Sequence, residues 1–233
     1  MEMEELRVGG LTPLTSLDYP GDLAAVVFCQ GCPWRCSYCH NNHLMPPVSA
    51  TITPWRQIEA FLGRRQGLLD AVVFSGGEPT LQSALSIALT RVKAMGYRIG
   101  LHTAGIYPER LGALVPHLDW VGLDIKALPE DYPTITGAAG SGERAWESLR
   151  LLLATGIPLE VRTTMPQDWQ LAHGMEMLMR RLADEGVEDY ALQTCRDTQR
   201  RTQDRQMTGF PAPLPPETLA KLGETLFRRF VLR

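Results

Sequence analysis

The sequence predicts an α/β fold built on a parallel sheet, and two observations support this prediction. Six short apolar runs recur along the chain, and five of the gaps between them can hold a helix. Strands that alternate with helices pair in parallel through right-handed crossovers. The pattern fits an open doubly wound sheet or a partial barrel, because the strands are too few for a full eightfold barrel.

The apolar runs define the strands, which are predicted at residues 24–29, 71–75, 97–103, 119–125, 157–164 and 189–194. Apolar residues spaced three and four positions apart define the helices between them. Gly96, Gly156 and Gly186 follow three of these helices as natural stops, and Thr53 with Pro54 can start the first. The helices are predicted at 54–62, 81–95, 108–115, 143–155 and 169–185, with a final helix at about 217–231.

No linker divides the sequence, so we expect a single domain over residues 1–233. Its core spans about 8–196, and residues 197–233 supply a loop rich in proline and arginine and then the final helix. The arginine-rich stretch 196–205 is expected to be a solvated loop, with a lid or a partner-docking surface as the alternative.

The composition excludes several classes of protein. The formal net charge is −3, so the chain has no basic excess with which to bind nucleic acid or an anionic membrane surface. No run approaches the about 18 consecutive apolar residues of a membrane span. The acidic start lacks the apolar region of a secretory signal, so we expect a cytoplasmic protein.

Cysteine is concentrated in one short segment. Four of the five cysteines, Cys29, Cys32, Cys36 and Cys39, fall within eleven positions, and the fifth is Cys195. Thiols this close in a cytosolic chain indicate a metal or redox site rather than a disulfide scaffold. The last three have the spacing C-x3-C-x2-C and follow the first predicted strand. Their loop therefore lies at the carboxyl edge of the sheet, where α/β proteins carry their active sites.

Polar side chains alternate with apolar ones along several predicted strands. In the fourth strand Asp124 and Lys126 share one face, and in the fifth strand Glu160 and Arg162 do the same. Burying charges is costly unless they pair or meet a charged ligand. The favoured interpretation is a polar cavity that binds a ligand with both signs of charge. The alternatives are that these residues pair among themselves or that the face is exposed. His102 and Gln193 complete the predicted polar face.

Several segments together resemble a known family. These are TSLDYPG at 15–21, CPWRCSYCHNN at 32–42, SGGEP at 75–79, LHTAG at 101–105 and GLDIK at 122–126. They are similar to the radical S-adenosylmethionine (SAM) superfamily, and within it to glycyl-radical-enzyme activating proteins. The nearest type is the activating protein of anaerobic ribonucleoside-triphosphate reductase. The resemblance spans roughly residues 8–196.

The resemblance implies a partial (β/α)6 barrel that holds one [4Fe–4S] cluster and SAM. Cys32, Cys36 and Cys39 match the cluster ligands. The implied reaction cleaves SAM reductively to a 5′-deoxyadenosyl radical, which removes hydrogen from a glycine of a partner enzyme, with flavodoxin or ferredoxin as electron donor. The positions that match the SAM site are Tyr38, Gly76, Gly77, Glu78, Thr103, Asp124, Lys126 and Arg162.

The sequence also leaves alternatives. His102 stands where an acidic residue is expected in pyruvate formate-lyase activators. Cys29 is expected to be a core residue; as a fourth ligand it would close the cluster and leave a module for electron transfer alone. A zinc site of Cys32, Cys36, Cys39 and His43 lacks the second cysteine knuckle of structural zinc sites. A radical SAM enzyme acting on a small molecule or peptide is the remaining alternative.

Overall fold

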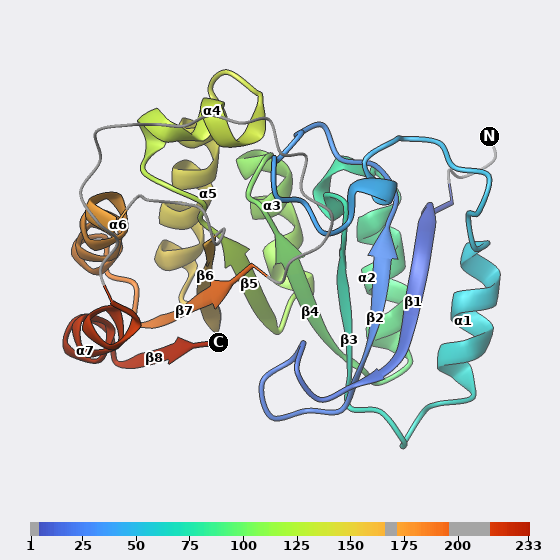
Figure 1. Cartoon of the computed structure of the whole chain (residues 1–233). Helices are drawn as coiled ribbons and strands as arrows, with labels where there is room; N and C mark the ends of the chain where they lie inside the picture. Colours follow the sequence, from blue (N-terminus) through green and yellow to red (C-terminus); the bar gives the residue numbers. More distant parts are fainter. Residues whose placement is uncertain (1–4, 166–171, 196–214) are drawn as a thin grey trace.

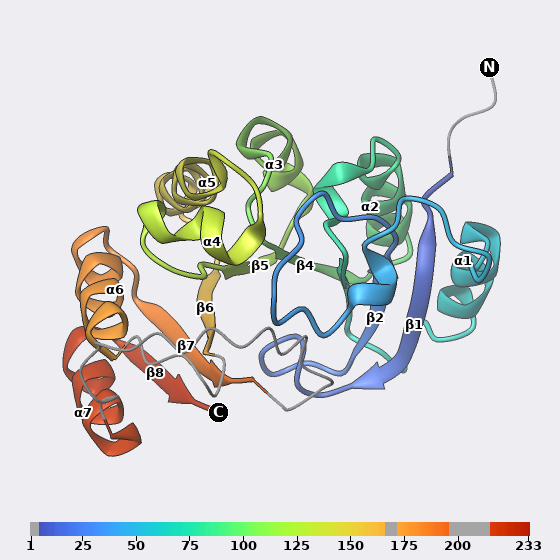
Figure 2. The ribbon, with the colours of Figure 1, turned by 45° about the horizontal axis from the view of Figure 1, so that its top comes forward.

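The computed structural model describes residues 5–165, 172–195 and 215–233. Eight strands form one sheet in the order β1 to β8. β1 is antiparallel to β2, and every other neighbouring pair is parallel. The sheet curves, and the helices follow its convex side (Figures 1 and 2). The predicted α/β partial barrel is confirmed.

All six predicted strands are present. They are β2 (Ala24–Cys29), β3 (Ala71–Gly76), β4 (Arg98–Thr103), β5 (Trp120–Asp124), β6 (Leu159–Met165) and β7 (Asp189–Thr194). Two further strands at the edges of the sheet, β1 (Val8–Thr15) and β8 (Arg229–Leu232), were not predicted. β1 contains two glycines and a proline, which weaken any strand pattern, and β8 is only four residues long.

Each predicted helix is present, but the boundaries differ, most of all at the end of the chain. The helices are α1 (Trp55–Gly63), α2 (Leu85–Ala94), α3 (Pro108–Leu114), α4 (Tyr132–Thr136), α5 (Ser141–Thr155), α6 (Ala172–Asp184) and α7 (Pro216–Leu226). The short α4 was not predicted, and the prediction of a helix to residue 231 was wrong. Phe227 and Phe230 pack against Tyr190 of β7, with ring centroids 4.7 and 5.9 Å away. Because these rings pack on β7, the chain leaves the helix after Leu226 and pairs with β7 as β8. The predicted loop 196–205 lies outside the described residues.

The apolar core lies between the sheet and the helices. Val121, Leu123 and Ile125 belong to it, so the predicted inward and outward faces of this segment are confirmed. A second, smaller apolar cluster lies on the concave face, where Tyr19 packs against Trp120 with centroids 5.5 Å apart. Tyr19 belongs to the loop between β1 and β2, which fills the amino end of the partial barrel.

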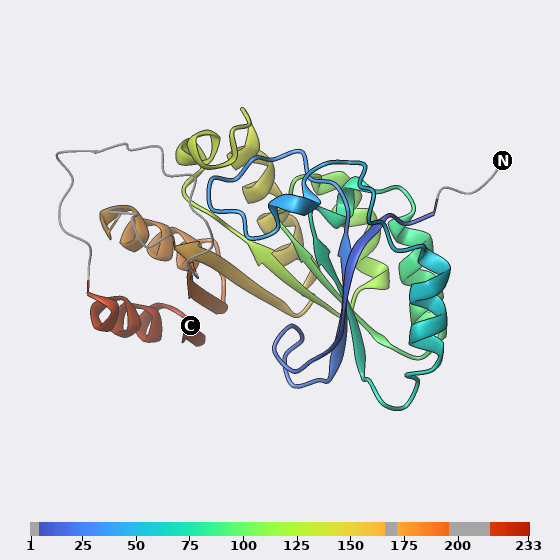
Figure 3. The ribbon, with the colours of Figure 1, turned by 45° about the vertical axis from the view of Figure 1, so that its right-hand side comes forward.

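The loop after β2 lies at the opposite end, beyond the carboxyl ends of the strands (Figure 3). Ligands of a curved parallel sheet bind at that end. Among the helices that the structure describes, none is both long enough and apolar enough to cross a membrane.

Candidate active site at the carboxyl ends of the strands

The cysteine loop is held by hydrogen bonds between backbone atoms. The amide of Cys32 donates to the carbonyl of Met45 at 3.0 Å. The amides of Arg35 and Ser37 donate to carbonyls of α4 at 2.8 and 3.2 Å. The cysteine loop therefore packs on α4, a helix that was not predicted from the sequence.

Cys32, Cys36 and Cys39 are each partly buried. Burial, and then the nearby charges of Glu78, Cys36 and Cys39, raise the pKa of the Cys32 thiol to about 12. Burial also raises the pKa of Cys36, while the ammonium of Lys126 opposes the rise.

These features fit the ligand set of a [4Fe–4S] cluster. Thiolates are the ligands of such clusters and must lose their protons on binding, which the positive charge of Lys126 favours at Cys36. Within the described ranges, no three His, Cys, Asp or Glu side chains are arranged to hold a single metal ion. This finding gives no support to the zinc alternative with His43.

Cys29 has a different environment. It is fully buried and packs in the main apolar core, on the same side of β2 as Ala25 and Val27. Burial raises the pKa of its thiol well above the usual value, with Glu78 adding to the rise. The prediction of a core residue is confirmed, and its position gives no support to a closed cluster with four thiolates.

Gly76 is the last residue of β3, and Gly77 begins the turn that follows it. Gly76 has a φ of +108°, and a Cβ there would lie 2.6 Å from the backbone nitrogen of Cys29. A Cβ at Gly77 would collide with the carbonyl of Gly31. The two glycines therefore allow close contact between this turn and the backbone of Cys29 and Gly31, just before the cysteine loop.

The Glu78 carboxylate lies inside the protein and has no exposed surface. Oε1 accepts hydrogen bonds from the Thr80 hydroxyl at 2.6 Å, the Thr103 hydroxyl at 2.7 Å and the Thr80 amide at 3.1 Å. Oε2 accepts from the amide of Ala104 at 2.9 Å. Burial raises the pKa of Glu78, and the four hydrogen bonds oppose the rise. Glu78 thus fastens the turn after β3 to the end of β4; its predicted role as counter-charge for SAM stays a prediction.

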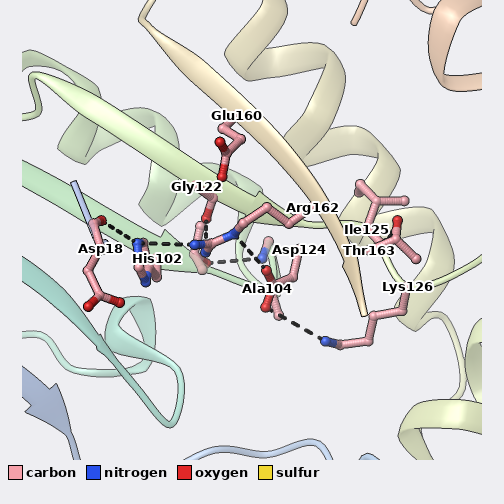
Figure 4. Close-up of polar contacts among 12 residues, drawn as sticks. Asp18, His102, Ala104, Gly122, Asp124, Ile125, Lys126, Glu160, Arg162 and Thr163 are labelled. Carbon is pink, nitrogen blue, oxygen red and sulfur yellow. Dashed lines mark hydrogen bonds and ion pairs between the residues drawn. The ribbon is translucent and has the colours of Figure 1, made fainter. Parts of the chain in front are cut away.

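A charged cluster lies on the concave face, where strand register brings side chains from β4, β5 and β6 together (Figure 4). Asp124 and Arg162 are direct partners across β5 and β6, and His102 is the partner of Gly122. Arg162 donates from Nε to Asp124 Oδ1 and from Nη2 to the Gly122 carbonyl, both at 3.2 Å. The Nζ of Lys126 lies 4.0 Å from Asp124 Oδ2.

The predicted convergence of these side chains is confirmed, and in this structure they pair with one another. A Cβ at Gly122 would lie 2.7 Å from Cζ of Arg162, so any larger residue there would displace the guanidinium. Lys126 also lies above the ring of Tyr38, with Nζ 5.8 Å from the centroid. Tyr38 and Lys126 therefore connect the cysteine loop to the charged cluster.

Two site residues had no signal in the sequence. The Tyr132 hydroxyl of α4 accepts a hydrogen bond from the Lys126 amide at 2.9 Å. Arg233, which follows β8, pairs with Glu160 at 2.9 Å, and its guanidinium lies 2.9 and 3.0 Å from the end of the Gln193 side-chain amide. Both contacts depend on elements that were not predicted.

Cys195 lies just after β7, at the rim expected from the sequence. Its Sγ is 3.2 Å from Nε2 of His40, which follows the last cysteine of the loop. This contact joins the cysteine loop to the far side of the partial barrel.

Comparison with known proteins identifies the family. The sequence model described as the radical SAM superfamily matches residues 26–178, more than half of the chain. A protein of Methanocaldococcus jannaschii that carries the provisional name glycyl-radical enzyme activating enzyme is 28% identical over 97% of this chain and 95% of its own length. The pyruvate formate-lyase-activating enzyme of Clostridium pasteurianum is 31% identical over 67% of each chain.

A solved structure shares the fold. The structure of Streptococcus suis SuiB bound to S-adenosylmethionine superposes with a TM-score of 0.64 at 13% identity, over 88% of this chain. The present chain spans 48% of that protein. The [4Fe–4S] cluster and SAM are the cofactors of the family, and the cysteine loop described above fits the cluster. The chain belongs to the radical SAM superfamily.

Proposed function

We propose that this protein installs a glycyl radical on a partner enzyme, and that the partner is an anaerobic ribonucleoside-triphosphate reductase. The observation that carries the activase proposal is the meeting of two features at one end of the partial barrel. The three-cysteine loop and the charged cluster of Asp124, Lys126 and Arg162 are connected there through Tyr38. The names of the M. jannaschii and C. pasteurianum relatives support the glycyl-radical class.

The chain's own residues would bind and orient both cofactors. Cys32, Cys36 and Cys39 would hold the cluster. When bound, the cluster and SAM supply a one-electron cleavage whose product radical can remove hydrogen from a Cα–H bond. Asp124 offers a negative charge suited to the methionine ammonium, and Lys126 with Arg162 offers positive charge suited to its carboxylate.

The glycines and Glu78 would shape the same site from β3. Gly76 and Gly77 bring their backbone against the start of the cysteine loop, and Glu78 with Thr103 fixes the neighbouring turn. We therefore assign these four residues to the walls of the SAM site. This assignment is supported by their position at the carboxyl ends of β3 and β4.

A glycine in a partner protein suits this chemistry. Glycine has no side chain to block approach, and a radical on its Cα is delocalised between two amide groups. A small one-electron donor of the flavodoxin or ferredoxin type would reduce the cluster. We expect these proteins to meet in the cytoplasm, because four thiols within eleven positions require a reducing compartment. Nucleic acid and membranes are not proposed as partners.

Two anaerobic assays test the proposal in sequence. The first reconstitutes the protein with iron and sulfide, adds dithionite and SAM, and quantifies 5′-deoxyadenosine. The second adds an anaerobic ribonucleoside-triphosphate reductase and records the electron paramagnetic resonance spectrum of a glycyl radical. Both signals support the full proposal. 5′-Deoxyadenosine without a glycyl radical on any glycyl-radical enzyme tested would favour the alternative, a small-molecule or peptide substrate.

A further inference from the structure

One ring nitrogen of His102 lies close to two groups, of which one needs a hydrogen-bond donor and the other an acceptor. Nε2 lies 3.0 Å from the carbonyl oxygen of Asp18 and 3.2 Å from Nη1 of Arg162 (Figure 4). A carbonyl can only accept a hydrogen bond, and a guanidinium can only donate one. A neutral ring nitrogen is either a donor or an acceptor, so it satisfies one of these neighbours at a time.

Protonation does not resolve the conflict. Burial, and then the positive charge of Arg162, lowers the pKa of His102 well below its usual value, so the ring is neutral at physiological pH. Of the two neighbours, the guanidinium loses more when it is unpaired, because it is charged and only 8% exposed. A carbonyl without a donor is tolerated more readily. In the ligand-free protein, the Nε2 lone pair therefore accepts from Arg162, and the Asp18 carbonyl receives no hydrogen bond from this ring.

Neighbouring residues hold the His102 ring in contact with both the Asp18 carbonyl and Arg162. The imidazole meets Trp120 edge to face, with centroids 5.4 Å apart. Asp18 lies in the loop between β1 and β2, which Tyr19 fixes against the same Trp120. Arg162 is tied by Asp124 and Gly122 at Nε and Nη2. Nη1 is thus the part of the guanidinium whose partner can change.

We propose that His102 is a positioning residue that changes tautomer when SAM binds. In the free protein Nδ1 carries the proton and Nε2 accepts from Arg162. When the carboxylate of SAM accepts from Nη1 in place of Nε2, the ring gives its Nδ1 proton to water and takes a proton from water at Nε2, which then donates to the Asp18 carbonyl. The net charge of the ring is unchanged. One hydrogen bond is exchanged for another, so Arg162 reaches the ligand without leaving a buried group unpaired. This inference rests on the proposed SAM site.

The direct test is nuclear magnetic resonance of the cluster-containing protein with 15N-labelled histidine. The chain has five histidines, and the signals that disappear in His102→Gln belong to His102. We expect the proton on Nδ1 without SAM and on Nε2 with saturating SAM. The inference is overturned if SAM binds and the same nitrogen carries the proton in both states. If the wild-type protein with a full cluster binds no SAM, the proposed function fails as well, and the two failures are distinguished.

His102→Gln gives a second, independent test. The glutamine amide has a donor and an acceptor at its tip, so it can satisfy Asp18 and Arg162 together. The free variant should unfold at a higher temperature than the wild type. It should bind SAM about tenfold more weakly, because Arg162 then gives up a hydrogen bond that nothing replaces. His117→Gln, the same change outside the site, should alter neither quantity. Wild-type SAM affinity in His102→Gln would contradict the tautomer change.

Discussion

Replacing Glu78 with glutamine tests whether this carboxylate fastens the fold or binds SAM directly. Three of its four hydrogen bonds end on Oε1, which the glutamine oxygen can replace. The fourth is lost, because the glutamine NH2 would face the Ala104 amide, which is also a donor. A hydrogen bond to a charged group contributes about 1.5–3 kcal/mol. The neutral glutamine avoids the desolvation cost of a buried carboxylate, which offsets part of this loss. We therefore expect the free energy of unfolding to fall by about 2 kcal/mol.

The assay is anaerobic thermal and denaturant unfolding of the two proteins at pH 7. A loss of this size lowers the melting temperature of a chain this long by about 4–8 °C. Glu59→Gln is the matched control, because it removes a more exposed ion pair with Arg91 that is worth about 0–1 kcal/mol. Unchanged stability together with weaker SAM binding in Glu78→Gln would refute the fastening role and favour direct contact with the ligand.

Three further predictions concern single residues. Cys29→Ser should keep the full iron content after reconstitution, and loss of the cluster would contradict the assignment of three ligands. Lys126→Ala should weaken SAM binding by about tenfold or more with iron content retained; unchanged affinity would remove Lys126 from the site. Because the fold lowers the pKa of His102, its contribution to stability is complete above about pH 6.5 and is lost as the pH falls below that value, by up to about 1.4 kcal/mol per unit. Denaturant midpoints at pH 7.5 and 5.5 should show this loss in the wild type and a smaller one in His102→Gln.

The parts of the fold that could be predicted are those with a local signal. Asp124 lies on the opposite face from Leu123 because alternation is a property of any strand. The cysteine spacing and the glycine-glutamate turn are likewise visible in a few consecutive letters. β8 has no such signal, since the packing of Phe227 and Phe230 on the distant Tyr190 decides its conformation.

The same distinction between local sequence signals and long-range contacts applies to the candidate site. The sequence could indicate which charges share the concave face, but not which of them would pair. Glu78 illustrates this, because its donors Thr103 and Ala104 come from the next strand and its orientation depends on them. The hydrogen bonds between the cysteine loop and α4 join segments about a hundred residues apart in the sequence. No local sequence pattern predicts them.

The backbone contacts of the cysteine loop have a consequence for how the protein acquires its cluster. Ordering one residue costs about 1–2 kcal/mol of conformational entropy. The hydrogen bonds of Arg35 and Ser37 to α4 order the segment between the cluster ligands when the protein folds. The entropy of ordering this segment is therefore lost on folding and not on cluster binding. Iron and sulfide therefore encounter thiols on a preorganised loop, and more of the binding free energy is available for affinity. Side chains add to this order, because Arg35 donates to the carbonyl of Cys32 at 2.8 Å and the buried Trp34 packs edge to face against Tyr132 of α4.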